Sequence, residues 1–148
     1  VILGGAEAQQ SQYASALLQQ PGVRLVSRFV DPTPYLADCA LTINPQQQIR
    51  GSALKIAESL LARRVCVSTA NGARGFTALQ NPALRVVQDW DAMALAINSL
   101  LQDLEGRHEL ETAAASARAA LSWDGRAAEL LQVYQGLLPD KFTGAGLR

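Results

Sequence analysis

Short apolar runs alternate along the chain with longer stretches in which apolar residues recur at helical spacing. Each run is four or five residues long and mostly apolar, as expected of a strand that is covered on both faces of a sheet. Regular alternation of such runs with helices is typical of parallel strands joined by crossover helices. The pattern therefore predicts five strands, at residues 1–4, 23–27, 40–44, 65–69 and 84–88.

The segments between these runs have the signals of helices. A helix over residues 6–19 is expected to end before Pro21-Gly22, and a shorter one over 34–39 follows the turn residues Asp31-Pro32. A third helix is predicted over residues 51–62.

The remainder of the chain is predicted to be helical. Residues 91–103 place apolar side chains on one face of a helix, and two further helices are expected over 105–121 and 123–138, before Pro139. The apolar face of the first of these helices comprises Met93, Ile97, Leu100 and Leu101. The expected fold is α/β, a Rossmann-like parallel sheet of about five strands flanked by helices and followed by C-terminal helices.

Composition narrows the class of protein. A chain of 148 residues that is 49% hydrophobic and 18% charged can bury the core of one ordinary domain. Thirteen basic residues balance thirteen acidic ones and no basic run exceeds Arg63-Arg64, which argues against a nucleic-acid partner. No stretch reaches the roughly 18 apolar residues of a membrane helix, so no transmembrane segment is expected. Cys39 and Cys66 lie in apolar runs, as buried thiols of a cytoplasmic protein do.

The loop after the third predicted strand has the strongest signal for ligand binding. In open parallel sheets, ligands bind where strand carboxyl ends meet helix N-termini. Here the small residues Gly51, Ser52 and Ala53 would let a ligand approach the backbone, and the amides of the following first helical turn are unpaired donors. This arrangement predicts a phosphate site. Glu58, two turns into the same helix, could accept hydrogen bonds from both hydroxyls of a ribose.

Residues 50–62 overlay, without a gap, the Glu, seven residues, Glu motif of one enzyme family. Four further segments are similar to motifs of that family in the same order, and the match as a whole extends over nearly the whole chain: residues 23–31, 35–40, 65–75 and 121–124. On these motifs the chain resembles the C-terminal, donor-binding domain of glycosyltransferases with the GT-B fold. It is most similar to the retaining family 4 (group 1) enzymes.

This resemblance implies an activity and a binding site. The activity is transfer of a sugar from a nucleoside-diphosphate sugar to an acceptor hydroxyl, with retention, in glycan or surface polysaccharide synthesis, and without a cofactor or metal. The backbone amides of the loop and helix start would hold the diphosphate, Glu58 the ribose, and the backbone at residues 28–30 the base. The implied donor site comprises Gly5, Arg28, Phe29, Val30, Arg50, Gly51, Ser52, Ala53, Leu54, Lys55 and Glu58. No catalytic residue is implied.

The resemblance also predicts how the domain is organised. Residues 1–122 would form the donor-binding domain, and residues 123–148 a helix and tail that pack back toward an N-terminal domain. That acceptor-binding domain and the family's first C-domain strand and helix would precede Val1, so the chain by itself is expected to be inactive. The acceptor would be a sugar or a lipid-linked sugar. The full-length protein would be cytoplasmic or associated with a membrane surface.

Other interpretations remain open beside this one. Arg50 replaces the first glutamate of the motif, which leaves a non-catalytic nucleotide-binding relative or scaffold as an alternative. Gly4-Gly5 lacks the third glycine of a dinucleotide fingerprint, which argues against a nicotinamide dehydrogenase. Arg74 is either a loop cation that faces the site or an ordinary surface residue. His108 is interpreted as a solvated helix residue that belongs to no metal cluster.

Overall fold

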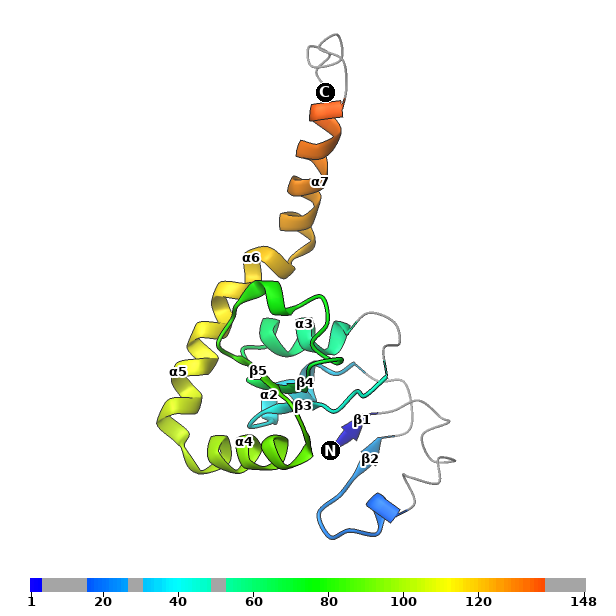
Figure 1. Ribbon diagram of the computed structural model, residues 1–148, viewed down its shortest axis with the longest axis vertical. Coiled ribbons are helices and arrows are strands. Elements are labelled where there is room, and N and C mark those ends of the chain that lie inside the picture. The colour runs from blue at the N-terminus through cyan, green and yellow to red at the C-terminus, as the bar shows by residue number, and fades with distance from the viewer. Residues whose placement is uncertain (4–15, 27–30, 49–52, 138–148) are drawn as a thin grey trace. The chain divides into compact units, whose positions relative to one another are not determined.

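The computed structural model describes residues 1–3, 16–26, 31–48 and 53–137, and it divides the chain into two compact units, Val1–Cys39 and Ala40–Arg148 (Figure 1). The predicted helix at 6–19 lies largely outside the described residues. The domain boundary predicted between residues 122 and 123 is not the boundary between these two units, and it stays a prediction.

The first unit contains a pair of short parallel strands. Strand β1 (Ile2–Leu3) pairs with β2 (Leu25–Val26). Helix α2 (Thr33–Asp38) follows, and Asp31 organises its start by accepting hydrogen bonds from the hydroxyl of Thr33 at 2.7 Å and from its amide at 2.9 Å. These two bonds stabilise the ionised carboxylate and lower the pKa of Asp31.

The second unit is built on a three-stranded parallel sheet. Its strands are β3 (Thr42–Asn44), β4 (Cys66–Thr69) and β5 (Leu84–Val87), hydrogen-bonded in that order (Figure 1). In this register Cys66 lies between Thr42 and Leu84. The helices of the unit are α3 (Leu54–Leu61), α4 (Trp90–Gln102), α5 (Leu104–Ala114), α6 (Arg118–Leu121) and α7 (Trp123–Leu137), with 3₁₀ turns at Thr77–Leu79 and Ala115–Ala117.

Side chains of successive residues in β4 pack on opposite faces of this sheet, as the pleat of a strand requires. Cys66 packs with the buried face of α3, whereas Val67 packs with α4. Figure 1 shows the sheet between these two helices. The α3 cluster comprises Ala53, Ile56, Leu60, Cys66, Ala73, Ala83, Leu84, Ala114 and Ala117, and the α4 cluster comprises Val65, Val67, Met93 and Leu100. Burial on both faces explains why the strands are continuous apolar runs in the sequence.

These elements confirm the predicted α/β, Rossmann-like fold with parallel strands and C-terminal helices. All five strands are present, although they form sheets of two and three strands and each is shorter than its apolar run. The predicted apolar face of α4 is wrong at Leu101, which is 52% exposed, because Met93 and Leu100 already define the buried side. The predicted helix at 105–121 is interrupted by the 3₁₀ turn between α5 and α6.

Among the described residues, no helix combines the length and the apolar character needed to cross a bilayer.

Candidate functional site

Two loops leave the carboxyl ends of β3 and β4, and side chains of the second loop bind the backbone of the first. The Thr69 hydroxyl donates to the carbonyl of Gln46, and the Asn71 side-chain amide donates to the carbonyl of Gln47 at 2.6 Å. Thr69 also accepts a hydrogen bond from the amide of Gly72 at 3.0 Å. The two loops therefore form one connected surface at this edge of the sheet.

Below this surface lies Asn44, a fully buried polar side chain at the end of β3. Its Nδ2 donates to the Ser68 hydroxyl at 3.2 Å and to the carbonyl of Gly72 at 3.0 Å. A Cβ at Gly72 would lie only 2.7 Å from both Asn44 Nδ2 and Ser68 Oγ, so only glycine fits there. Asn44 Oδ1 has no hydrogen-bond partner among the described residues, although it is buried.

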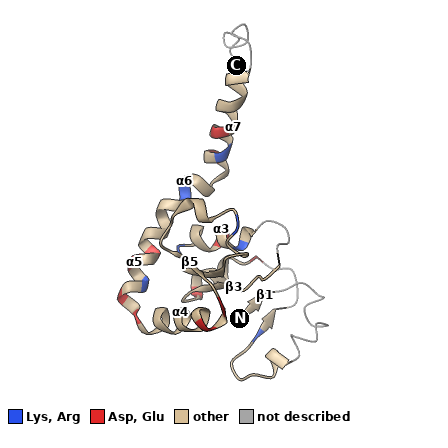
Figure 2. Ribbon diagram, viewed as in Figure 1, with Lys and Arg blue, Asp and Glu red and all other residues tan. Residues whose placement is uncertain are grey.

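Helix α3 begins after the first of these loops, at the same edge of the sheet. Its N-cap residue is Ala53, no side chain of the described residues caps the helix, and its first turn contains no acidic residue. Lys55 adds a positive charge to this turn (Figure 2). Unpaired amides at the positive end of the helix dipole, with no acidic side chain beside them, suit an incoming anion.

The exposed face of α3 carries the predicted site residues of this helix. Leu54 is 60% exposed, and Lys55 and Glu58 are also exposed, whereas Ile56 and Leu60 face the core. The Glu58 carboxylate makes no hydrogen bond or ion pair with any other described residue. The structure thus brings Ala53, Leu54, Lys55 and Glu58 together at the start and on the outer face of one helix, with an acceptor available for a ligand.

The other predicted donor-site residues lie outside the described part of the chain: Gly5, Arg28, Phe29, Val30, Arg50, Gly51 and Ser52. Arg74 is exposed in the loop after β4, at the edge of the sheet where α3 begins.

Sequence reasoning missed the polar residues that connect the two loops. Asn44, Ser68, Thr69 and Asn71 follow or end apolar strands, and polar residues in that position are a signal for a site at the carboxyl edge of a parallel sheet. They were not singled out because each looks like an ordinary turn residue until the strands are paired.

The buried cysteine of the three-stranded sheet, Cys66, is not suited to nucleophilic chemistry. Burial raises the pKa of the Cys66 thiol, and a hydrogen bond with Thr42 and the charge of Lys55 oppose this effect only in part. A buried thiol of raised pKa stays protonated and unreactive. Among the described residues, no group of three or more His, Cys, Asp and Glu side chains is arranged to hold a metal ion.

A family model described as "Glycosyl transferases group 1" matches residues 1–103, more than two thirds of the chain. The chain belongs to the group 1 glycosyltransferases. A search of curated proteins gave no match. The matched part of this group 1 glycosyltransferase includes the two joined loops and the whole of α3, so the region described above lies within the family's own fold. The domain is of the GT-B C-terminal type, and its family transfers sugars from donor to acceptor.

Proposed function

We propose that this domain binds a nucleoside-diphosphate sugar at the start of α3 and supplies the donor half of a retaining glycosyltransferase. The observation that carries the proposal is the uncapped first turn of α3, at the carboxyl edge of the sheet, in a chain of the group 1 family. In this proposal the amides of residues 51–54 bind the diphosphate, and Lys55 adds positive charge beside it. In this proposal the attraction between the negative diphosphate and the positive end of the α3 dipole holds the diphosphate without a metal.

Glu58 is the proposed ribose ligand. Its carboxylate is exposed on the same face as Leu54 and is not engaged by other described residues, and an ionised carboxylate accepts two hydrogen bonds from vicinal hydroxyls. The base would lie against the backbone of residues 28–30, with Gly5 bordering the site. The acceptor, a sugar or a lipid-linked sugar in glycan or surface polysaccharide synthesis, would bind another domain of the full-length protein.

The contribution of these residues to catalysis would be positioning and electrostatic stabilisation. As the bond from the anomeric carbon to the diphosphate breaks, negative charge grows on the leaving oxygen, and the helix amides and Lys55 favour that charge. Holding donor and acceptor together adds the advantage of proximity. Neither effect requires a nucleophilic side chain from this domain.

A thermal-shift titration with the diphosphates of uridine, guanosine, adenosine and thymidine tests this proposal, because a ligand that binds only the folded state raises Tm. One nucleotide should raise Tm, and Glu58→Ala should weaken its binding by about 1 to 3 kcal/mol, the cost of losing hydrogen bonds to a charged group. Glu109→Ala, which removes another exposed glutamate on α5, is the matched control and should bind as the unmodified chain does. The absence of any shift, in the chain and in the full-length protein alike, would contradict the proposal.

A second function, nucleotide binding without transfer, is favoured by Arg50 at the first glutamate of the family motif. Arginine cannot accept a hydrogen bond from a sugar hydroxyl, although it can pair with phosphate. Incubation of the full-length protein with a sugar nucleotide separates the two functions. Release or transfer of the sugar supports the enzyme, whereas nucleotide binding without release supports the scaffold.

A further inference from the structure

A second polar site lies at the opposite end of α3 from the proposed donor site. It is a pocket of about 180 Å³ between the segment that follows α3 and the outer face of α5. Its lining residues are Ala62, Arg63, Arg64, His108, Glu111 and Thr112. Because α3 starts at the carboxyl edge of the sheet and β4 begins just after Arg64, this pocket is at the amino edge, away from the donor loops.

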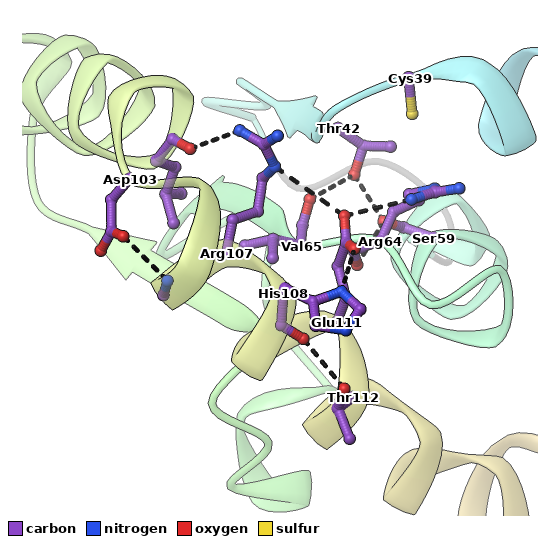
Figure 3. A network of polar contacts seen from close by, with 12 residues as sticks. Cys39, Thr42, Ser59, Arg64, Val65, Asp103, Arg107, His108, Glu111 and Thr112 are labelled. Atoms are coloured by element: carbon purple, nitrogen blue, oxygen red, sulfur yellow. Dashed lines mark hydrogen bonds and ion pairs between the residues drawn. The ribbon is translucent and has the colours of Figure 1, made fainter.

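An ion network supports one wall of the pocket. The Glu111 carboxylate lies 3.1 Å from Nη1 of Arg64, 4.0 Å from Nε of Arg107 and 3.8 Å from Nδ1 of His108. Figure 3 shows Glu111 between the two arginines, with His108 beside it. The carboxylate is thus offset by its partners, and among the residues that line the pocket two arginines against one glutamate leave an excess of one positive charge.

Arg63 lies just after the last turn of α3 and adds an exposed cation to this pocket. Its φ is +58°, the left-handed conformation in which helices commonly end, although glycine is the usual residue there. The Arg63 guanidinium is exposed and has no hydrogen-bond or ion-pair partner among the described residues. The left-handed turn closes α3 in an ordinary way, because the Arg63 amide donates to the Leu60 carbonyl at 3.0 Å and the Arg64 amide to the Ser59 carbonyl at 2.9 Å. The exposed guanidinium, and not the backbone, is therefore what Arg63 offers a ligand.

We propose that this pocket, defined by Arg63, Arg64 and His108, binds a phosphate group. Guanidinium forks match the oxygens of phosphate, and donors from the α3 end and from α5 approach it from two sides. A hollow of about 180 Å³ is large enough for inorganic phosphate or a small phosphate monoester. The competing explanation is that Arg63 and Arg64 only complement the negative end of the α3 dipole.

The single histidine of the chain makes this site directly observable. We would follow the C2 proton of His108 by NMR during a titration with inorganic phosphate, at fixed pH and with chloride matching the ionic strength. The resonance should move and saturate. Arg63→Gly should weaken the response by roughly tenfold or more, since a charge-assisted hydrogen bond is lost while glycine accepts the left-handed backbone without strain.

Two variants and a second ligand complete the test. Arg85→Ala, which removes an exposed arginine of β5, and Glu58→Ala, in the proposed donor site, should both leave the titration unchanged. Tighter binding of glycerol phosphate would identify a phosphate monoester as the ligand, and equal binding would identify inorganic phosphate. The proposal is overturned if His108 shows no saturable shift, or if Arg63→Gly titrates as the unmodified chain does.

Discussion

Helices α3 and α4 each follow a strand of the same sheet, yet their first turns are completed in opposite ways. The start of α4 is closed by the chain itself, because the Asp89 carboxylate accepts a hydrogen bond from the amide of Ala92 at 2.8 Å. Asp91 places a second negative charge in that turn. The start of α3 has Ala53 as its N-cap and no acidic residue, and none of the residues that the structure describes caps it with a side chain.

The first turn of α5, a helix that does not follow a strand, is capped in the same way. The N-cap of α5 is Asp103, whose carboxylate accepts a hydrogen bond from the amide of Gly106 at 2.9 Å, and Glu105 lies in the first turn of the helix. Figure 2 shows acidic residues, in red, where α4 and α5 begin. A capping side chain contributes about 1 kcal/mol, so α3 lacks a stabilisation that its neighbours have. Departures from local helix rules tend to occur at functional sites, and here the departure leaves room for an anion from outside the chain.

The largest predicted effect concerns the loops beside the open start of α3. Gly72→Ala should lower the free energy of unfolding by about 1 to 3 kcal/mol, because the new methyl group would overlap Asn44 and Ser68 and push the two loops apart. Urea unfolding followed by circular dichroism measures the change. Gly136→Ala is the matched control: its Cβ meets nothing within 4 Å inside α7, so it should be neutral or slightly stabilising. A neutral Gly72→Ala would show that the loops are not held as described.

The next largest effect on stability concerns the capped first turns of α4 and α5. Asp89→Ala and Asp103→Ala should each lower the free energy of unfolding by about 1 kcal/mol, because each removes the acceptor of a first-turn amide. Asp89→Asn keeps an acceptor oxygen and should recover most of that loss. Urea midpoints for the four proteins, including the unmodified chain, give the comparison. If the alanine variants are as stable as the unmodified chain, the closed and open starts do not differ energetically and the contrast with α3 loses its meaning.

Much of the fold was predictable because its signals are local. Continuous apolar runs predicted the strands, and Met93 and Leu100 at helical spacing predicted the buried side of α4. Pairing into two sheets was not predicted. Which strands pair depends on contacts between residues that are distant in the sequence, and the apolar runs carry no information about those contacts.

The site was predictable where its residues are adjacent in sequence. Ala53, Leu54, Lys55 and Glu58 belong to one helix, and a motif of fixed spacing identified them. The contact between loops was not predictable, because Asn44 and Ser68 are 24 residues apart and become neighbours only through the register of β3 and β4. The polar pocket near His108 was missed for the same reason, since its residues come from the segment after α3 and from α5, which are far apart in the sequence.

The smallest effect on stability is the most specific test of the comparison. Leu54→Glu gives α3 the acidic first turn that α4 and α5 already have, at a side chain that is 60% exposed. A negative charge near a helix N-terminus contributes about 0.3 to 1 kcal/mol, so the ligand-free domain should become slightly more stable. The same charge occupies the position proposed for the diphosphate. Thermal shift with the preferred nucleotide should therefore show a raised Tm without ligand and a smaller ligand-induced rise.

Leu95→Glu is the matched control for this substitution. Leu95 is 70% exposed and lies within α4, beyond its first turn, so the same change of residue adds charge without meeting the positive end of a dipole. Stability and nucleotide response should both stay near those of the unmodified chain. In Leu54→Glu, higher stability together with weaker nucleotide binding would follow only if the diphosphate and the new carboxylate compete for the same amides. Loss of stability in Leu54→Glu, with nucleotide binding unchanged, would instead place the diphosphate elsewhere.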